Sequence, residues 1–281
     1  MSLEHKHPLD VFIKIDRLPH RFCPGCGVAT TLNIFLHAIK ELVDEGKLDP
    51  KKLVVVSGIG CTGRVSGYLK FDGAHTPHGR PIPFAMGVKL ANPELKVVVI
   101  SGDGDIVGIG GNHLIHAARR NMDITVIMVN NFIYAMTGGQ VAPTTPQKVY
   151  TTTTPYGNPE PPFNVVRLVA SIGANYLARW AITHPFQLKN SIKKAILREG
   201  FSFIEVISTC TERFGRRVGI GDPVKLYNKL KAIAKIRKVS PFEAKYNWDE
   251  EITCGEFIDE EKPGFIQMYF NMVKKELGDR T

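Results

Sequence analysis

Two apolar segments of this sequence each end in a short loop of glycine, acid or amide residues. Residues 96–101 run directly into Gly102-Asp103-Gly104-Asp105, and residues 124–129 run into Asn130-Asn131. Short apolar runs bounded by turn residues predict buried strands of a parallel sheet, whose carboxyl ends meet at one edge. Glycine lets the backbone approach a bulky anion, and carboxylate and amide oxygens are ligands that Mg²⁺ prefers. The pattern therefore predicts a metal-bridged diphosphate at the edge of a parallel sheet.

Strands and helices are expected to alternate along most of the chain. Besides the two strands above, the sequence predicts strands at 53–57, 174–178 and 201–207, and helices from Gly27 to about Gly46 and at 84–91, 112–120 and 186–198. This alternation predicts an α/β fold with a doubly wound parallel sheet, in which ligands bind beyond the carboxyl ends of the strands. The segment from 222 onward is charged and lacks the alternation. We expect a domain over 1–221 and a C-terminal extension over 222–281 that packs on a partner.

Composition limits the class of protein. The 281 residues are 43% hydrophobic and 22% charged, which is typical of a globular domain with ample core. The net charge is +9, but the basic residues form no stripe with interleaved aromatics, so nucleic acid is not expected as a partner. No apolar run reaches the roughly 18 residues of a membrane span, and the first residues lack the apolar core of a signal peptide. We therefore expect a cytoplasmic protein that does not enter a membrane.

Five cysteines in such a chain favour metal or redox chemistry over disulfides. Cys23 and Cys26 form a CxxC pair just before a predicted helix, whereas Cys61 and Cys210 stand alone in loops that follow predicted strands. A zinc ribbon would normally show a second CxxC, and there is none. Four thiolates that converge at the ligand edge suit an iron–sulfur cluster better. Cys254 lies in the charged extension and is expected to be incidental.

The combined motifs resemble a known family. A GDG motif followed about 25 residues later by NN is similar to the diphosphate-binding motif of thiamine diphosphate enzymes, and here residues 105–129 separate Gly104 from Asn130. The whole set resembles the β subunit of the 2-oxoacid:ferredoxin oxidoreductases. The matching segments lie between about residues 20 and 215, namely Cys23-Pro24-Gly25-Cys26-Gly27, Gly58-Ile59-Gly60-Cys61, His78-Gly79-Arg80, Gly102 to Asp105 with Asn112-His113, and Asn130-Asn131 with Met136-Thr137-Gly138-Gly139-Gln140.

The resemblance implies a role for individual residues. Cys23, Cys26, Cys61 and Cys210 would ligate one 4Fe-4S cluster, and Asp103, Asn131 and Ile133 would hold Mg²⁺. Thiamine diphosphate would be lined by Ile59, Gly60, Cys61, Thr62, His78, Gly79, Arg80, Gly102, Gly104, Asp105, Asn131, Ala135 and Met136. Two positions depart from the family pattern: Ala135 stands where glycine is more frequent, and Thr209 precedes Cys210 where proline is common.

The family's reaction is the coenzyme A-dependent oxidative decarboxylation of a 2-oxoacid, with electrons passed through the cluster to ferredoxin. In thiamine diphosphate enzymes a second domain supplies the glutamate that activates the cofactor. This chain has room for only the diphosphate-binding half, so an α subunit is expected, and γ or δ ferredoxin-like subunits remain open. Arg64 is the candidate for pairing with the substrate carboxylate. The loop 136–140 favours 2-oxoglutarate, while pyruvate and branched-chain or aromatic 2-oxoacids remain open.

Two other classes of protein are compatible with parts of the pattern. One is a thiamine diphosphate decarboxylase or carboligase with a structural zinc site at the cysteines. The other is a noncatalytic metal-binding protein, which would not bind thiamine diphosphate with magnesium. A brown protein that bleaches with oxoacid and coenzyme A would separate the expected enzyme from both.

Overall fold

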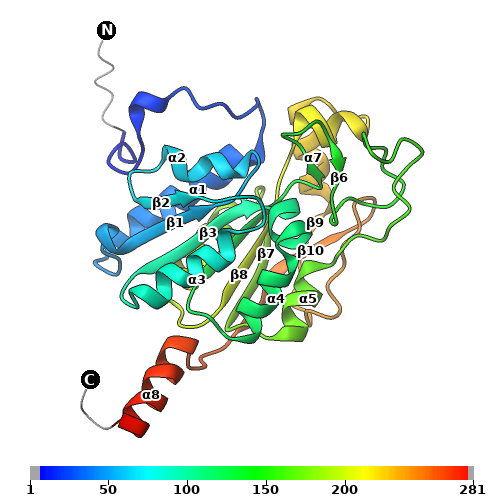
Figure 1. The fold of residues 1–281 in the computed structure, drawn as a ribbon. Coiled ribbons are helices and arrows are strands. Elements are labelled where there is room, and N and C mark those ends of the chain that lie inside the picture. The colour runs from blue at the N-terminus through cyan, green and yellow to red at the C-terminus, as the bar shows by residue number, and fades with distance from the viewer. Residues whose placement is uncertain (1–6, 278–281) are drawn as a thin grey trace.

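A single mixed sheet of eight strands forms the centre of the molecule (Figure 1). The computed structural model describes residues 7–277. The strands lie in the order β2-β1-β3-β4-β8-β7-β10-β9. Their bounds are β1 Leu53–Ser57, β2 Asp72–His75, β3 Lys96–Gly102, β4 Thr125–Asn130, β7 Tyr176–Ala181, β8 Ser202–Ile207, β9 Ala234–Ile236 and β10 Ile252–Asp259. From β2 to β7 every neighbouring pair is parallel, which confirms the predicted parallel α/β sheet.

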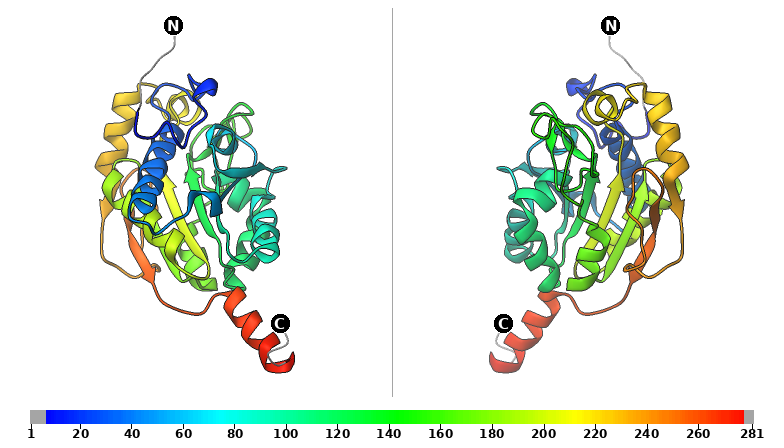
Figure 2. Two further views of the ribbon diagram at one scale, coloured as in Figure 1. Left: turned by 90° about the vertical axis from the view of Figure 1, so that its left-hand side faces the viewer. Right: turned by 90° about the vertical axis from the view of Figure 1, so that its right-hand side faces the viewer.

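Helices cover both faces of this sheet, as Figure 2 shows from its two sides. One face packs against α1 (Gly27–Asp44) and α6 (Pro185–Leu197), and the other against α3 (Pro81–Ala91), α4 (Gly111–Arg119) and α5 (Val165–Ile172). The strands β1, β3, β4, β7 and β8 alternate between the two cores because successive side chains point to opposite faces. In β4, for example, Ile127 enters one core and Val126 the other.

Several element boundaries differ from those expected. α3 begins at Pro81 rather than 84, since proline suits the first turn of a helix, where its missing N–H has no partner to lose. β7 begins two residues later than predicted and extends to Ala181. β2 was not predicted at all, because Asp72–His75 is an edge strand without an apolar run. The short helix α2 (Val65–Tyr68) and the small hairpin of β5 (Ile133–Tyr134) and β6 (Gln140–Val141) complete the loops around the sheet.

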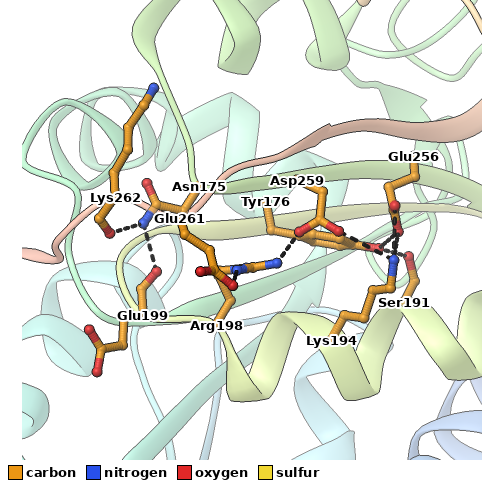
Figure 3. Close-up of polar contacts among 10 residues, drawn as sticks. All are labelled: Asn175, Tyr176, Ser191, Lys194, Arg198, Glu199, Glu256, Asp259, Glu261 and Lys262. Atoms are coloured by element: carbon orange, nitrogen blue, oxygen red, sulfur yellow. Dashed lines mark hydrogen bonds and ion pairs between the residues drawn. The ribbon is translucent and has the colours of Figure 1, made fainter.

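The segment after 222 departs most from expectation, because much of it joins the sheet. After α7 (Pro223–Ile233), β9 and β10 add two strands, and β10 runs antiparallel to β7. Figure 3 shows the ion pairs that hold β10 against α6: Lys194 on α6 pairs with Glu256 at 2.9 Å and with Asp259 at 3.3 Å. Buried Asn175 donates hydrogen bonds to the carbonyls of Glu199 and Lys262, at 2.8 and 2.6 Å.

Among the elements within residues 7–277, α8 (Phe265–Leu277) is the one that leaves the body of the domain. It projects beyond the end of the sheet in all views, and none of its residues is buried (Figures 1 and 2). Met268, Tyr269, Phe270 and Met272 are all exposed on it. Within residues 7–277, no helix has both the length and the apolar composition needed to span a bilayer.

Candidate functional site

The loops after β1, β2, β3 and β4 enclose a cavity of about 160 Å³, here called the cradle. The structure brings together there most of the residues expected around the cofactor, together with Thr137 of the 136–140 motif and with Tyr134, which the sequence did not single out. The cradle is lined by Ile59, Gly60, Cys61, Thr62, His78, Gly102, Asp103, Gly104, Asp105, Asn131, Ile133, Tyr134, Ala135, Met136 and Thr137. Gly79 and Arg80 lie outside this lining, and Arg80 is exposed.

Asp103 and Asn131 come from adjacent strands, as the sequence predicted, and face each other. One terminal amide atom of Asn131 lies 3.2 Å from Oδ1 of Asp103 and 2.7 Å from the carbonyl oxygen of Ile133. Without a cation, the amide nitrogen must face these two acceptors. With the amide oxygen in that position, three oxygens meet at separations close to the roughly 2.9 Å between neighbouring ligands of octahedral Mg²⁺. This donor set therefore fits a magnesium ion.

Asp103 is almost completely buried. Burial raises its pKa from the usual 3.8 to about 7, although a hydrogen bond from the Thr144 hydroxyl to Oδ2 opposes the rise. A carboxyl group with such a pKa favours a bound cation, because the cation would replace the missing hydration of the carboxylate.

Asp105 acts as the central hydrogen-bond acceptor between three loops. Its Oδ1 accepts hydrogen bonds from the backbone N–H of Gly79 at 2.7 Å and of Ile59 at 3.3 Å. The ring of His78 approaches the same oxygen at 2.5 Å, and the Ser101 hydroxyl donates to Oδ2 at 2.6 Å. Asp105 thus positions the cradle's walls, since both of its oxygens are occupied by protein donors.

Tyr134 closes the cradle at Gly104. Its hydroxyl donates a hydrogen bond to the Gly104 carbonyl at 3.0 Å. A Cβ atom at position 104 would lie only 2.1 Å from the Tyr134 ring, so this contact requires glycine. No short motif marks Tyr134, because its partner lies 30 residues earlier in the chain.

The CxxC loop docks on the loop that carries Cys210. Gly27 N–H donates to the Thr209 carbonyl at 3.0 Å, the Thr209 hydroxyl donates to the Gly25 carbonyl at 2.8 Å, and the Thr211 hydroxyl donates to the Pro24 carbonyl at 3.0 Å. A Cβ at Gly27 would meet Ser208 Oγ at 2.2 Å, which explains the glycine after Cys26. Threonine at 209, unlike proline, therefore supplies a cross-loop hydrogen bond.

The four predicted cluster cysteines lie close enough to affect one another electrostatically. Burial raises the pKa of the Cys26 thiol to about 11, and Cys210 and Cys61 add to the rise. Burial is also the main cause of the raised pKa values of Cys61 and Cys210, and the Cys23 thiol contributes to both. Within the described part of the chain, no three His, Cys, Asp or Glu side chains are arranged as a ready metal-binding group.

Arg64 follows Cys61 by three residues, at the end of the short turn Thr62–Arg64. Its exposed side chain lines a separate groove together with Lys14, Arg17, Arg21 and His75. The structure therefore places this predicted substrate-binding residue beside the cradle and not in its lining. The sequence alone could not locate it, because three residues beyond Cys61 the chain has already turned through Thr62–Arg64 into α2.

Comparison with known proteins supports the same cofactor. Residues 58–206 match the family described as "Thiamine pyrophosphate enzyme, C-terminal TPP binding domain". The chain is 46% identical to the 2-oxoglutarate synthase subunit KorB of Methanothermobacter marburgensis over 277 residues, covering 97% of this chain and 94% of that one. It is 43% identical to the β subunit of 2-oxoacid:ferredoxin oxidoreductase 2 of Aeropyrum pernix over 190 residues, covering 68% of this chain and 60% of that one.

A solved structure agrees with these sequence relatives. The 2-oxoglutarate:ferredoxin oxidoreductase from Magnetococcus marinus, with 2-oxoglutarate, coenzyme A and succinyl-CoA bound, matches 99% of this chain and 92% of its own. The TM-score is 0.83 and the identity 29%. Together with the cradle and its thiamine pyrophosphate family match, these relatives identify the chain as a member of the β subunits of the 2-oxoacid:ferredoxin oxidoreductases.

Proposed function

We propose that this β subunit takes part in the coenzyme A-dependent oxidative decarboxylation of 2-oxoglutarate, with electrons leaving through one 4Fe-4S cluster to ferredoxin. The observation that carries the proposal is the docking of the Cys23–Gly27 loop on the Thr209-Cys210 loop. Cys61 lines the cradle and would then contact the cofactor on one side and ligate the cluster on the other. When bound, thiamine diphosphate serves as the electron sink for the decarboxylation.

The residues of this chain bind and orient the cofactor. Asp103, Asn131 and the Ile133 carbonyl would hold Mg²⁺ through the three oxygens described above. The backbone around Gly104 and the loop 59–62 would border the diphosphate, and Asp105 would hold these loops in place. The thiols of Cys23, Cys26, Cys61 and Cys210 would turn toward a common iron–sulfur cluster, which requires them as thiolates. Arg64, from the neighbouring groove, would pair with a substrate carboxylate.

The choice of substrate rests on the relatives. KorB subunits from Methanothermobacter marburgensis and Methanocaldococcus jannaschii, both 46% identical, are named for 2-oxoglutarate synthase. Pyruvate and branched-chain or aromatic 2-oxoacids are the alternatives, because partner subunits build part of the pocket. A glutamate to activate the cofactor would come from an α subunit, so the isolated chain is expected to be inactive.

We also propose that the C-terminal segment contacts a partner subunit through α8. Before α8, this segment contributes the strands β9 and β10 to the sheet, whereas α8 has no buried residue. A 13-residue helix is marginal by itself in water, so a partner surface would stabilise it. The supporting observation is thus the exposed apolar group of Met268, Tyr269, Phe270 and Met272 on α8, beyond the first turn that Phe265 anchors to the domain.

The proposal is tested by anaerobic purification of this chain with and without an α partner. We expect a brown complex whose visible absorbance bleaches on addition of 2-oxoglutarate and coenzyme A, and no turnover by the chain alone. Oxoacids assayed in parallel, including pyruvate, rank the substrates by kcat/KM. A colourless, zinc-containing complex that decarboxylates without reducing an acceptor would contradict the proposal and favour the decarboxylase alternative.

A further inference from the structure

We infer that Tyr246, from the segment before β10, is a positioning residue for the metal–diphosphate site. Tyr246 lies outside residues 58–206, the span that matches the cofactor-binding family. Its hydroxyl accepts a hydrogen bond from Asn130 Nδ2 at 2.8 Å and donates one to the Thr144 carbonyl at 3.0 Å. One phenol therefore connects the two loops that flank the proposed magnesium ligands.

The hydrogen bond from Tyr246 to the Thr144 carbonyl acts on Asp103 through the Thr144 side chain. Thr144 is fully buried, and its side-chain hydroxyl donates to Asp103 Oδ2. This hydrogen bond occupies Oδ2 and leaves Oδ1 facing the Asn131 amide. By holding the Thr144 backbone, Tyr246 fixes the donor that sets the rotation of the Asp103 carboxylate.

The hydrogen bond from Asn130 to the Tyr246 hydroxyl acts on Asn131 and Ile133 through the backbone of Phe132. Asn130 Oδ1 accepts a hydrogen bond from Phe132 N–H at 3.1 Å, and Phe132 has a φ of 66°, in the left-handed region that favours glycine. This unusual backbone lies between Asn131 and Ile133. The Phe132 ring also packs beside Tyr246, with 6.1 Å between ring centroids. Asn130 and Tyr246 thus support the turn that brings the Ile133 carbonyl to the Asn131 amide.

A buried ion pair supports this arrangement from within the sheet. Asn130 Nδ2 also donates to Glu205 Oε1 at 2.7 Å, and Arg179 Nε donates to Glu205 Oε2 at 2.6 Å. The Arg179 guanidinium lies 5.1 Å from the centroid of the Tyr246 ring and donates to the carbonyls of Lys245 and Thr253. Arg179 therefore fixes the backbone on which Tyr246 is carried, so the position of its hydroxyl is well defined.

The inference rests on the proposed magnesium site, and its test measures binding directly. Tyr246→Phe keeps the ring but removes the hydroxyl. In the complex with the α partner, we expect the Kd for thiamine diphosphate at fixed Mg²⁺ to rise by about 10-fold, as for other groups that orient metal ligands. The Mg²⁺ concentration needed for half-saturation should rise likewise, while kcat at saturating cofactor stays within about twofold. Titration calorimetry and steady-state assays supply the two readouts.

Two further variants keep the result interpretable. Tyr227→Phe removes the hydroxyl of an exposed tyrosine on α7 and should leave both constants unchanged. Thr144→Val should weaken cofactor binding in the same direction as Tyr246→Phe, because it removes the hydrogen bond to Asp103. If wild-type protein binds thiamine diphosphate equally well in EDTA, the magnesium site itself is wrong. If binding requires Mg²⁺ but Tyr246→Phe matches the Tyr227→Phe control, the positioning role of Tyr246 is wrong.

Discussion

The Nδ1 atom of the His78 ring lies 2.5 Å from Oδ1 of Asp105, and this hydrogen bond ties the loop after β2 to the loop after β3. The same oxygen receives the backbone N–H groups of Gly79 and Ile59. Three loops that are distant in sequence therefore depend on one buried carboxylate.

Asp105→Asn should loosen the cradle without changing the side chain's size. The amide keeps one acceptor oxygen but presents an N–H₂ group to donors that now lack a partner, at a cost of about 2–3 kcal/mol of unfolding free energy. Chemical denaturation and thiamine diphosphate binding should both show the loss. Asp44→Asn is the matched control: its side chain is 58% exposed and pairs only with Lys40, so a change below about 0.5 kcal/mol is expected. Equal stabilities for the two variants would contradict the role of Asp105.

Gly104→Ala should damage the site by steric overlap. The added Cβ would lie 2.1 Å from the Tyr134 ring, and displacing that ring should cost about 1–3 kcal/mol of stability and weaken cofactor binding. Gly87→Ala, inside α3, is the comparison, because a Cβ there meets nothing within 4 Å. Alanine is the better helix former by about 1 kcal/mol, so this second variant should be slightly stabilised. Thermal unfolding of both proteins gives the contrast, and a stable Gly104→Ala protein with normal affinity would exclude the predicted clash.

Magnesium binding should depend on pH through Asp103, whose pKa is raised to about 7. Below that pH the carboxyl group holds a proton that the cation must displace, so affinity should fall about 10-fold between pH 8 and pH 6. Calorimetry in buffers of different ionisation enthalpy should detect the released proton. The stability of the metal-free protein should change with pH in the opposite direction to Mg²⁺ affinity. Between about pH 4 and 7, Asp103 is protonated in the folded state but ionised in the unfolded chain, so the free energy of unfolding falls as pH rises. Asp103→Asn should abolish both effects, and their persistence in that variant would assign them to another group.

The cysteines differ in their expected contribution to the iron–sulfur cluster. Cys210→Ser should lose most of the bound iron and the brown absorbance, because it removes one of the four proposed thiolate ligands. Cys254→Ala should retain both, since Cys254 lies fully buried in β10, and its thiol donates only to the Ile252 carbonyl. Iron analysis and electron paramagnetic resonance after anaerobic purification distinguish the two variants. Full iron content in Cys210→Ser would remove Cys210 from the ligand set.

The sequence predicted the parts of the fold that depend on local apolar patterns. β1, β3, β4 and β8 are buried throughout most of their length. β1, β3 and β4 each contain an uninterrupted apolar run, and the run of β8 is broken only by Glu205. β2 and β9 carry exposed residues at sheet positions, so neither shows that pattern. The charged appearance of the C-terminal segment likewise concealed β10, whose Glu256 and Asp259 are used for pairing with α6.

The same limit applies to the site. Asp103, Asn131 and the loop 59–62 belong to short motifs, and the structure places them around one cavity. Tyr134, Thr144 and Tyr246 were missed because each acts through a contact with a residue at least 30 positions away. Such pairs become visible only when strand order is known. Arg64 and Arg80 matched motifs, yet both side chains lie outside the cavity lining.

The position of β8 between β4 and β7 has a consequence for the order in which the protein is made. Of the six mutually parallel strands β1, β2, β3, β4, β7 and β8, β8 is the last in sequence, yet it lies between β4 and β7 in the sheet. During synthesis, β1 to β4 can associate early, but β7 has no strand to pair with until residues 202–207 leave the ribosome. The Asp103–Asn131 side of the cradle can therefore form before the Cys210 loop exists. The emerging chain would therefore complete its diphosphate-binding side first, while the CxxC loop, although made earlier, would have no Cys210 loop to dock on until β8 is finished.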